Sequence, residues 1–357
     1  MKAELKILKR QKHAVRISLK KLRRKRILKR RNQKPSQDNR KITTPRRLRR
    51  ALISSEIKVR KQRGKRPIKL EAPANFSLLE NTDEVLNFFK IARDYLMKGK
   101  SVFFDIENIG HITPESIALL SASVNDVNFV SYGNVGGNIP KFPDVKKKLS
   151  ESGFFDHVKL NGAKPKKINS MLLHIKSAKR VQETTARDLC IFGINHVFTN
   201  FFKFQPLYEI FIECMQNTTN HAGLNTRSLY DWWVFAYNDT ISNTTHFTFL
   251  DLGVGIFQSL PMKNYKKIAR FAGISRNVDL VDDLFAGKIK SRTMEPDRGK
   301  GIPQIKYLAE GTNFLKFVLI SNDVYTDLKS GNSHSLNQNF KGTLFYWELE
   351  GDKNRQS

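Results

Sequence analysis

Residues 81–153 alternate between apolar residues at helical spacing and short apolar runs that are typical of buried strands. A polar start at 81–84 precedes apolar residues at helical spacing between Val85 and Leu96, and Gly99 is expected to end this helix. The rest of the pattern predicts strands at 101–106 and 129–132, helices at 114–123 and 143–153, and a turn-rich segment at 133–140. Strands and helices that alternate over about 80 residues indicate a small α/β domain.

A second series of elements begins at Thr185. It predicts helices at 186–202, 206–222 and 302–310, and strands at 231–238, 245–251, 314–321 and 343–350. Residues 160–184 are rich in lysine and asparagine, and we interpret them as a linker or a connecting strand. The two series fit the one to three domains expected of 357 residues.

Positive charge is concentrated in the first 70 residues. They hold 29 lysines and arginines against three acidic residues, a net charge of +26 of the +30 on the whole chain. Such a block repels itself and attracts polyanions, and its few aromatic residues favour phosphate contacts without sequence reading. We predict that residues 1–72 form a basic, disordered arm that anchors the chain to nucleic acid. Scattered apolar residues would let positions 4–30 become helical on a polyanion or a membrane surface. A solubilising tail or a targeting peptide is the alternative.

The chain's compartment and metal chemistry are constrained by what the sequence lacks. Cys190 and Cys214 are the only cysteines, and neither has a partner at zinc-binding spacing. No apolar region of a secretory signal follows the first charges, and no run of about 18 apolar residues predicts a membrane span. We therefore expect a cytoplasmic protein with no transmembrane segment.

Candidate chemistry begins with Glu213, Asn217 and His221, which are four residues apart and so share one face of the second predicted helix. Magnesium prefers oxygen ligands, and the Asn217 carbonyl together with phosphate oxygens would serve it. Glu213, one turn earlier, is placed to orient and deprotonate an attacking water. Alone, a glutamate and an asparagine at this spacing are more typical of a solvated helix face.

Three glycine-containing segments follow in order. Asp251 ends an apolar strand, where its carboxylate can accept the adenine amino hydrogen, and Gly253 and Gly255 let the backbone approach a base closely. Gly299, Lys300 and Gly301 precede a predicted helix, whose first amide groups attract phosphate. Gly342 and Thr343 open the last predicted strand. The arrangement is not a Walker loop.

The order and spacing of these four segments resemble the N box and glycine boxes of the GHKL ATPase superfamily, over roughly residues 185–350. The resemblance implies a two-layer α/β sandwich of the Bergerat type, with helices over a mixed, mostly antiparallel sheet, that binds ATP and Mg²⁺. It implies Glu213 as the catalytic base, Asn217 as the magnesium ligand and residues 256–298 as a basic lid over the triphosphate. The residues implied in ATP binding are Asn217, His221, Asp251, Gly253, Gly255, Gly299, Lys300, Gly301 and Thr343, and Thr343 would fix both the adenine and Asp251.

The smaller domain resembles the STAS domains of anti-sigma-factor antagonists in the succession 102–106, 112–116 and 145–155. In that family a strand ending in Asp leads to a phosphorylatable Ser or Thr at a helix start. Here Thr113-Pro-Glu-Ser116 replaces the usual Asp-Ser-Ser/Thr-Gly. We therefore expect a degenerate STAS-like scaffold without a phosphoacceptor.

Together these features predict an α/β protein whose parts are an arm, a STAS-like domain, a linker, a GHKL-type domain and a tail, at 1–72, 73–160, 161–184, 185–351 and 352–357. The expected function is a Mg-ATP-binding regulatory ATPase or switch. An anti-sigma-type serine/threonine kinase that acts on a STAS-like partner is one alternative, and a non-hydrolysing ATP sensor is another. The candidate partners are nucleic acid, a STAS-like or other protein, and a second copy of the chain.

Overall fold

The computed structural model describes residues 66–125, 134–156, 158, 172–178, 181–200, 204–221, 231–260, 276–289 and 301–352. All of them belong to one compact unit, Val59–Ser357. The predictions for the basic arm at residues 1–65 lie outside the described residues.

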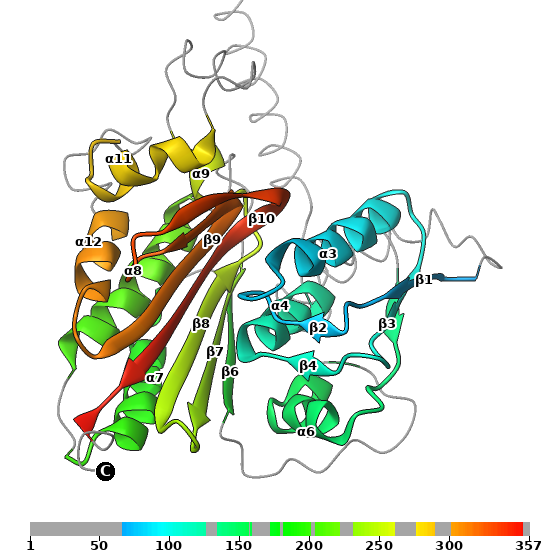
Figure 1. Cartoon of the computed structure of the whole chain (residues 1–357), viewed down its shortest axis with the longest axis horizontal. Helices are drawn as coiled ribbons and strands as arrows, with labels where there is room; N and C mark the ends of the chain where they lie inside the picture. Colours follow the sequence, from blue (N-terminus) through cyan, green and yellow to red (C-terminus); the bar gives the residue numbers. More distant parts are fainter. Residues whose placement is uncertain are drawn as a thin grey trace, which may run out of the picture. The chain divides into compact units, whose positions relative to one another are not determined.

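The smaller α/β domain is built on a parallel sheet of three strands (Figure 1). Its strands, in the order β1-β3-β5, are β1 (Ile68–Glu71), β3 (Val102–Asp105) and β5 (Val135–Gly137). A second parallel pair joins β2 (Asn75–Phe76) to β4 (His111–Ile112). The helices are α3 (Thr82–Met97), α4 (Pro114–Asn125), α6 (Pro143–Glu151) and η1 (Phe154–Asp156).

The three helices predicted in this domain are confirmed, with shifts at their ends. The first ends at Met97, and Gly99, with φ 72°, donates its amide to the Leu96 carbonyl at 2.8 Å. The predicted turn-rich segment contains the short strand β5, and β1 lies within the last residues of the predicted arm. The strand predicted at 129–132 lies outside the described residues.

The larger domain is a five-stranded sheet with helices on one face (Figure 1). Its strands, in the order β6-β7-β8-β10-β9, are β6 (Leu172–Ala178), β7 (Asp231–Asp239), β8 (Thr244–Asp251), β10 (Ser333–Glu350) and β9 (Phe314–Asp327). The helices are α7 (Glu183–Val197), α8 (Gln205–His221), α9 (Ile256–Ser259), η2 (Asn277–Leu280), α11 (Val281–Phe285) and α12 (Gly301–Ala309).

The sheet of the larger domain differs from its prediction in three ways. Every pairing of its described strands is antiparallel, where a mixed, mostly antiparallel sheet was expected. The segment 172–178, interpreted as a linker or connecting strand, pairs with β7 as the edge strand β6. Strand β10 begins at Ser333, ten residues before its predicted start. The prediction missed its first half because these residues are polar and carry no apolar pattern.

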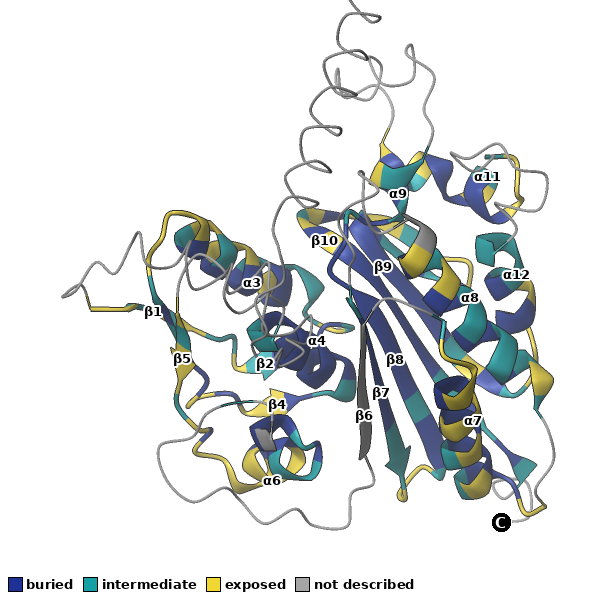
Figure 2. Cartoon of the chain, turned by 180° about the vertical axis from the view of Figure 1, so that it is seen from behind, coloured by how far each residue is buried: buried dark blue, intermediate teal, exposed yellow. Residues whose placement is uncertain are grey.

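This sheet is buried on both faces (Figure 2). On β7, Trp232 packs with the core under α7, α8 and α12, whereas the adjacent Trp233 packs with the core of the smaller domain. On β10, Phe345 and Tyr346 alternate in the same way. Period-two alternation sends neighbouring side chains to opposite faces, so continuous apolar strands need cover on both sides. The smaller domain therefore adds a layer to the predicted two-layer sandwich.

The two domains are also joined by hydrogen bonds between α3 and the first half of β10. The Asp83 carboxylate accepts the Asn337 amide at 2.9 Å, the Asn337 side-chain Nδ2 at 2.8 Å and the Gln338 amide at 3.1 Å. Lys90 Nζ donates to Gln338 Oε1 at 3.1 Å. The polar start of β10 thus has a structural partner that lies about 250 residues earlier in the chain.

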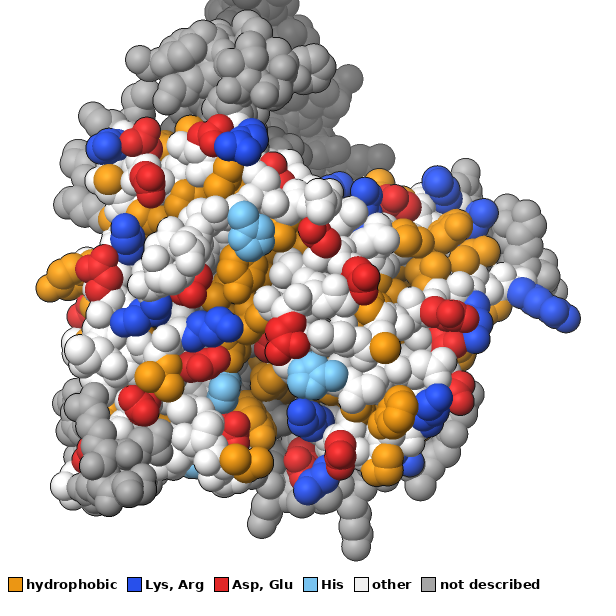
Figure 3. Space-filling view, viewed as in Figure 1, with side chains coloured by type: hydrophobic (Ala, Val, Ile, Leu, Met, Phe, Trp, Pro, Cys, Tyr) orange, Lys and Arg blue, Asp and Glu red, His pale blue; other side chains and the backbone are white. Residues whose placement is uncertain are grey.

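Charge on the described surface is mixed. Lysine and arginine side chains are interspersed with aspartate and glutamate over the face seen in Figure 3. This agrees with the small net charge of the sequence after residue 70. No helix in the described part of the chain is long and apolar enough to span a bilayer.

Candidate functional site

Helix α8 carries the first two candidate residues on the edge of its buried face. Leu207, Phe211, Cys214 and Thr218 point into the core at a spacing of three to four residues and fix the helix against the sheet. Glu213 and Asn217 lie beside that row and are half-buried. His221 is the last residue of the helix, and its side chain lies outside the described part.

Gly301, the first residue of α12, lies directly against this pair. A Cβ on Gly301 would stand 2.6 Å from Glu213 Oε2 and 3.3 Å from Asn217 Oδ1. Carbon and oxygen atoms do not approach to 2.6 Å without strain, so this position accepts only glycine while Glu213 keeps its place. The fold therefore brings Gly301 against two polar residues that lie more than 80 positions earlier in the sequence.

The Asn217 amide has an unused hydrogen-bonding group at this meeting point. Its Nδ2 is buried and has no hydrogen-bond partner among the described residues. A buried polar group without a partner costs about 1 to 3 kcal/mol, which a ligand would recover. Rotation of the amide exchanges its nitrogen and oxygen, so the same position can offer a donor to phosphate or an oxygen to a cation.

Glu213 has the electrostatic setting of a proton acceptor. Burial raises the pKa of its carboxyl, and the negative charge of Glu209, one turn earlier, raises it further. A carboxylate with a raised pKa holds a proton more readily, which suits a general base. Glu209 itself accepts a hydrogen bond from Gln205 Nε2 at 3.1 Å.

Asp251, the last residue of β8, is almost fully buried and is held by hydrogen bonds from several elements. Oδ1 accepts the Gly253 amide at 2.8 Å, Oδ2 accepts Thr218 Oγ1 at 3.3 Å, and the Thr343 side chain is a third donor. Burial raises the pKa of Asp251 to about 6, and these three hydrogen bonds limit the rise. The carboxylate is therefore fixed in position.

Two glycines close to Asp251 are required by tight contacts. Gly255 has φ 82°, and a Cβ there would stand 2.5 Å from Oδ1 of Asn322. Asn322 in turn donates to the Val254 carbonyl at 2.9 Å and accepts the Gln258 amide at 3.2 Å. Gly342 has φ 151°, and a Cβ there would stand 2.1 Å from the Asp251 carbonyl oxygen.

Three supporting residues were not predicted from the sequence. Thr218 donates to Asp251, and Asn322 locks the turn at Gly255. Ser321 Oγ accepts the Ile256 amide and donates to the Gly342 carbonyl, so it joins two of the glycine segments. The polar pair Ser321-Asn322 interrupts the apolar run of β9, and this interruption is the signal that sequence reasoning could have used.

Part of the predicted site cannot be placed. Gly299 and Lys300 lie outside the described residues, as do most of the basic residues of the predicted lid. In that lid, residues 277–285 form η2 and α11, and Leu280, Leu284 and Phe285 pack in the core with α12. This part of the predicted lid is therefore a packed helical segment.

The candidate phosphoacceptor region of the smaller domain is buried. Ser116 has no exposed surface, and its Oγ accepts the Leu78 amide at 2.8 Å. Thr113 donates to the buried Glu115. In this conformation the Ser116 hydroxyl is not accessible to a phosphate donor.

The expected magnesium site depends on Asn217 and on phosphate oxygens, and it does not need a cluster of protein ligands. No group of three or more His, Cys, Asp or Glu side chains in the described part of the chain is arranged to hold a metal ion. A magnesium ion held mainly by phosphate oxygens needs few protein ligands, so Asn217 fits the expected role. Comparison with the models of known protein families and with curated proteins gives no match.

Proposed function

We propose that residues 185–350 bind Mg-ATP as a GHKL-type domain and act as a regulatory ATPase or switch. The observation that carries this proposal is the close approach of Gly301 to Glu213 and Asn217, where a Cβ would collide with the Glu213 carboxylate and crowd the Asn217 amide. The buried, unpartnered Nδ2 of Asn217 at the same place supports a ligand there. The helix with Glu213 and Asn217 and the glycine segment that ends at Gly301 were identified separately in the sequence, and they lie in contact in the structure.

Adenine recognition is assigned to Asp251. Its carboxylate is held by Gly253, Thr218 and Thr343 and would accept the amino hydrogen of adenine. Guanine carries a carbonyl at that position and would repel the carboxylate. A rigid, buried acceptor discriminates strongly, because the wrong base leaves it without a donor.

Phosphate chemistry is assigned to the start of α12 and to α8. The free amide groups at the first turn of α12 favour negative charge. Asn217 would supply one oxygen to Mg²⁺, which would neutralise charge on the phosphates. Glu213 would take the proton of the attacking hydroxyl group, and its raised pKa suits that step.

The ATPase and the kinase hypotheses differ in which hydroxyl group attacks the γ-phosphate. Water would make the protein an ATPase, and a serine or threonine would make it a protein kinase. The burial of Ser116 argues against phosphorylation of that residue by the same chain. The ATPase reading is therefore the proposal, and the kinase acting on a partner is the second candidate.

The deciding experiment uses ATP labelled on the γ-phosphate with the full chain and with Asp251→Asn. Release of labelled phosphate supports hydrolysis, labelled protein supports the kinase, and tight binding with neither product supports an ATP sensor. Asp251→Asn presents an NH₂ group toward the adenine amino group or gives up its own hydrogen bonds, so it should weaken binding. A folded Asp251→Asn protein with unchanged ATP affinity would refute the assignment.

The basic arm is proposed to anchor this switch to nucleic acid. With a charge of +26 in 70 residues, its affinity for duplex DNA should fall steeply with salt, at a slope of about −0.9 per phosphate neutralised. Deletion of residues 1–65 should abolish this binding and leave ATP binding intact. Full-length protein that binds neither DNA nor RNA at low salt would refute the anchoring role.

A further inference from the structure

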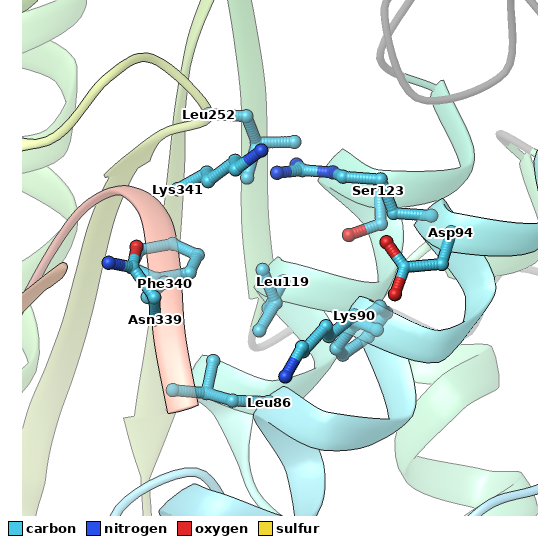
Figure 4. A pocket seen from close by; sticks show the side chains of 11 residues that line it. Leu86, Lys90, Asp94, Leu119, Ser123, Leu252, Asn339, Phe340 and Lys341 are labelled. Atoms are coloured by element: carbon cyan, nitrogen blue, oxygen red, sulfur yellow. The ribbon is translucent and has the colours of Figure 1, made fainter. Parts of the chain in front are cut away.

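A cavity of about 160 Å³ lies where the smaller domain meets the sheet (Figure 4). Its apolar lining comes from α3, α4, the turn after β8 and β10, through Leu86, Phe89, Leu119, Leu252 and Phe340. An apolar cavity of roughly 150 Å³ is large enough for a benzene ring. The apolar lining of the cavity therefore has room for one small apolar group. It is built by elements of both domains.

Positive charge gathers at the rim of this cavity. Lys90, Arg93 and Lys341 all line it, and Asp94 is the only acidic side chain among its lining residues. Asp94 makes no ion pair with a described residue, and Lys341 Nζ has neither an ion-pair nor a hydrogen-bond partner there. In Figure 4, Lys341 from β10 and Lys90 from α3 reach toward the space between the two elements. Lys90 and Lys341 against the single carboxylate of Asp94 leave a net attraction for negative charge at this rim.

A serine in the wall adds a polar group beside the apolar floor. Ser123 on α4 is only 2% exposed, and it lines the cavity. Its hydroxyl can donate a hydrogen bond to a ligand oxygen at this wall.

We propose that this cavity binds a small organic anion, in which a phosphate or carboxylate is attached to an apolar body about the size of one ring. The ring would rest on the leucine and phenylalanine floor, and the anionic group would face Lys90, Lys341 and the Ser123 hydroxyl. The site is distinct from the Asp251 site, because it lies on the face of the sheet that the smaller domain covers.

The cavity also borders the adenine anchor through the backbone. Leu252 directly follows Asp251, and Lys341 directly precedes Gly342 and Thr343. A ligand that holds Leu252 and Lys341 would thus constrain both segments that fix Asp251, and nucleotide affinity should change with it. This coupling rests on the proposed function, whereas the binding of the anion does not.

The test of binding is a titration of the full chain with phenyl phosphate, followed through the methyl NMR signals of Leu86, Leu119 and Leu252. We expect all three to shift, with a dissociation constant of about 1 mM. Inorganic phosphate and phenol, each half of the probe, should bind more weakly. Lys341→Gln should weaken phenyl phosphate binding about fivefold, since it removes one partly exposed charge contact. Lys146→Gln, on the exposed face of α6, is the matched control and should change nothing.

Absence of methyl shifts at several times that concentration would overturn the site, and so would equal affinities in Lys341→Gln and the parent. The coupling is tested by ATP affinity with and without phenyl phosphate, in the parent and in Lys341→Gln. A change in the parent that Lys341→Gln abolishes is expected. Methyl shifts with an unchanged ATP affinity would overturn the coupling. Methyl shifts in a protein that binds no ATP would refute the proposed function and leave the anion site standing.

Discussion

Replacement of Gly301 by alanine adds one methyl group at the centre of the candidate site. The new Cβ would stand 2.6 Å from Glu213 Oε2, where a relaxed contact between carbon and oxygen is about 3.4 Å, so the carboxylate must retreat by roughly 0.8 Å. Asn217 Oδ1, at 3.3 Å, would need to give less. A displacement of about 1 Å in a catalytic group lowers the rate by about 100-fold.

The fold should tolerate the same change. Gly301 does not require a positive φ, and the atom it would meet is the end of a flexible side chain. Glycine to alanine at a compatible helical position stabilises a protein by about 0.4 to 1 kcal/mol. We therefore expect a native or slightly raised urea midpoint together with a turnover reduced about 100-fold, which separates a catalytic effect from unfolding.

The assay is phosphate release from saturating ATP, with the urea midpoint measured on the same preparation. Gly136→Ala is the matched control, because its Cβ would meet Phe103 at an ordinary 3.7 Å and should leave both quantities unchanged. A Gly301→Ala protein that turns over ATP at the parent rate would show that Glu213 and Asn217 do not act where α12 begins.

Three further outcomes are expected. Glu213→Ala should retain ATP binding and lose about two to four orders of magnitude in turnover, whereas parent-like turnover would transfer the role to another residue such as Glu209. Burial raises the pKa of Asp251 from 3.8 to about 6. Between about pH 4 and pH 6 the folded state therefore binds a proton that the unfolded state has lost, and the free energy of unfolding falls as pH rises through this range. Urea unfolding should show this loss, up to about 3 kcal/mol, in the parent and not in Asp251→Asn, and parallel curves would refute the shift. Asp83→Ala should lower the free energy of unfolding by about 1 to 3 kcal/mol through the lost bonds to β10, and Asp144→Ala, an acidic residue in the first turn of α6 with no such contact, should not. If both variants lost the same free energy of unfolding, Asp83 would not stabilise the contact between the two domains.

The parts that could be predicted are those that a local pattern determines. The spacing of Glu213 and Asn217 placed both on one helix face, and the glycine positions indicated where the backbone must approach another group. Helices α3, α4 and α8 followed from apolar periodicity alone. Each of these inferences uses residues within one or two turns of each other.

The parts that could not be predicted depend on distant partners. The first half of β10 is polar. It is a strand because it pairs with β9 from Ser333 to Ser335, and Asp83 and Lys90 on α3 bind the residues that follow. The contact of Gly301 with Glu213 joins segments whose separation in sequence carries no distance information. Strand β6 is an edge strand within a lysine-rich stretch of sequence. The composition of that stretch favoured its interpretation as a linker.

The double burial of the large sheet has a consequence for synthesis on the ribosome. Helix α3 is complete by Met97, but β10, which it covers, begins about 240 residues later. At 5 to 20 residues per second, the face of α3 that β10 covers must wait roughly 10 to 50 s for it. During that interval this face of α3 lacks its final cover, so the nascent chain should be a strong client of chaperones that bind near the exit tunnel. A stop between the two domains would leave each fragment with an exposed apolar surface, and we expect the fragments to aggregate when they are produced separately.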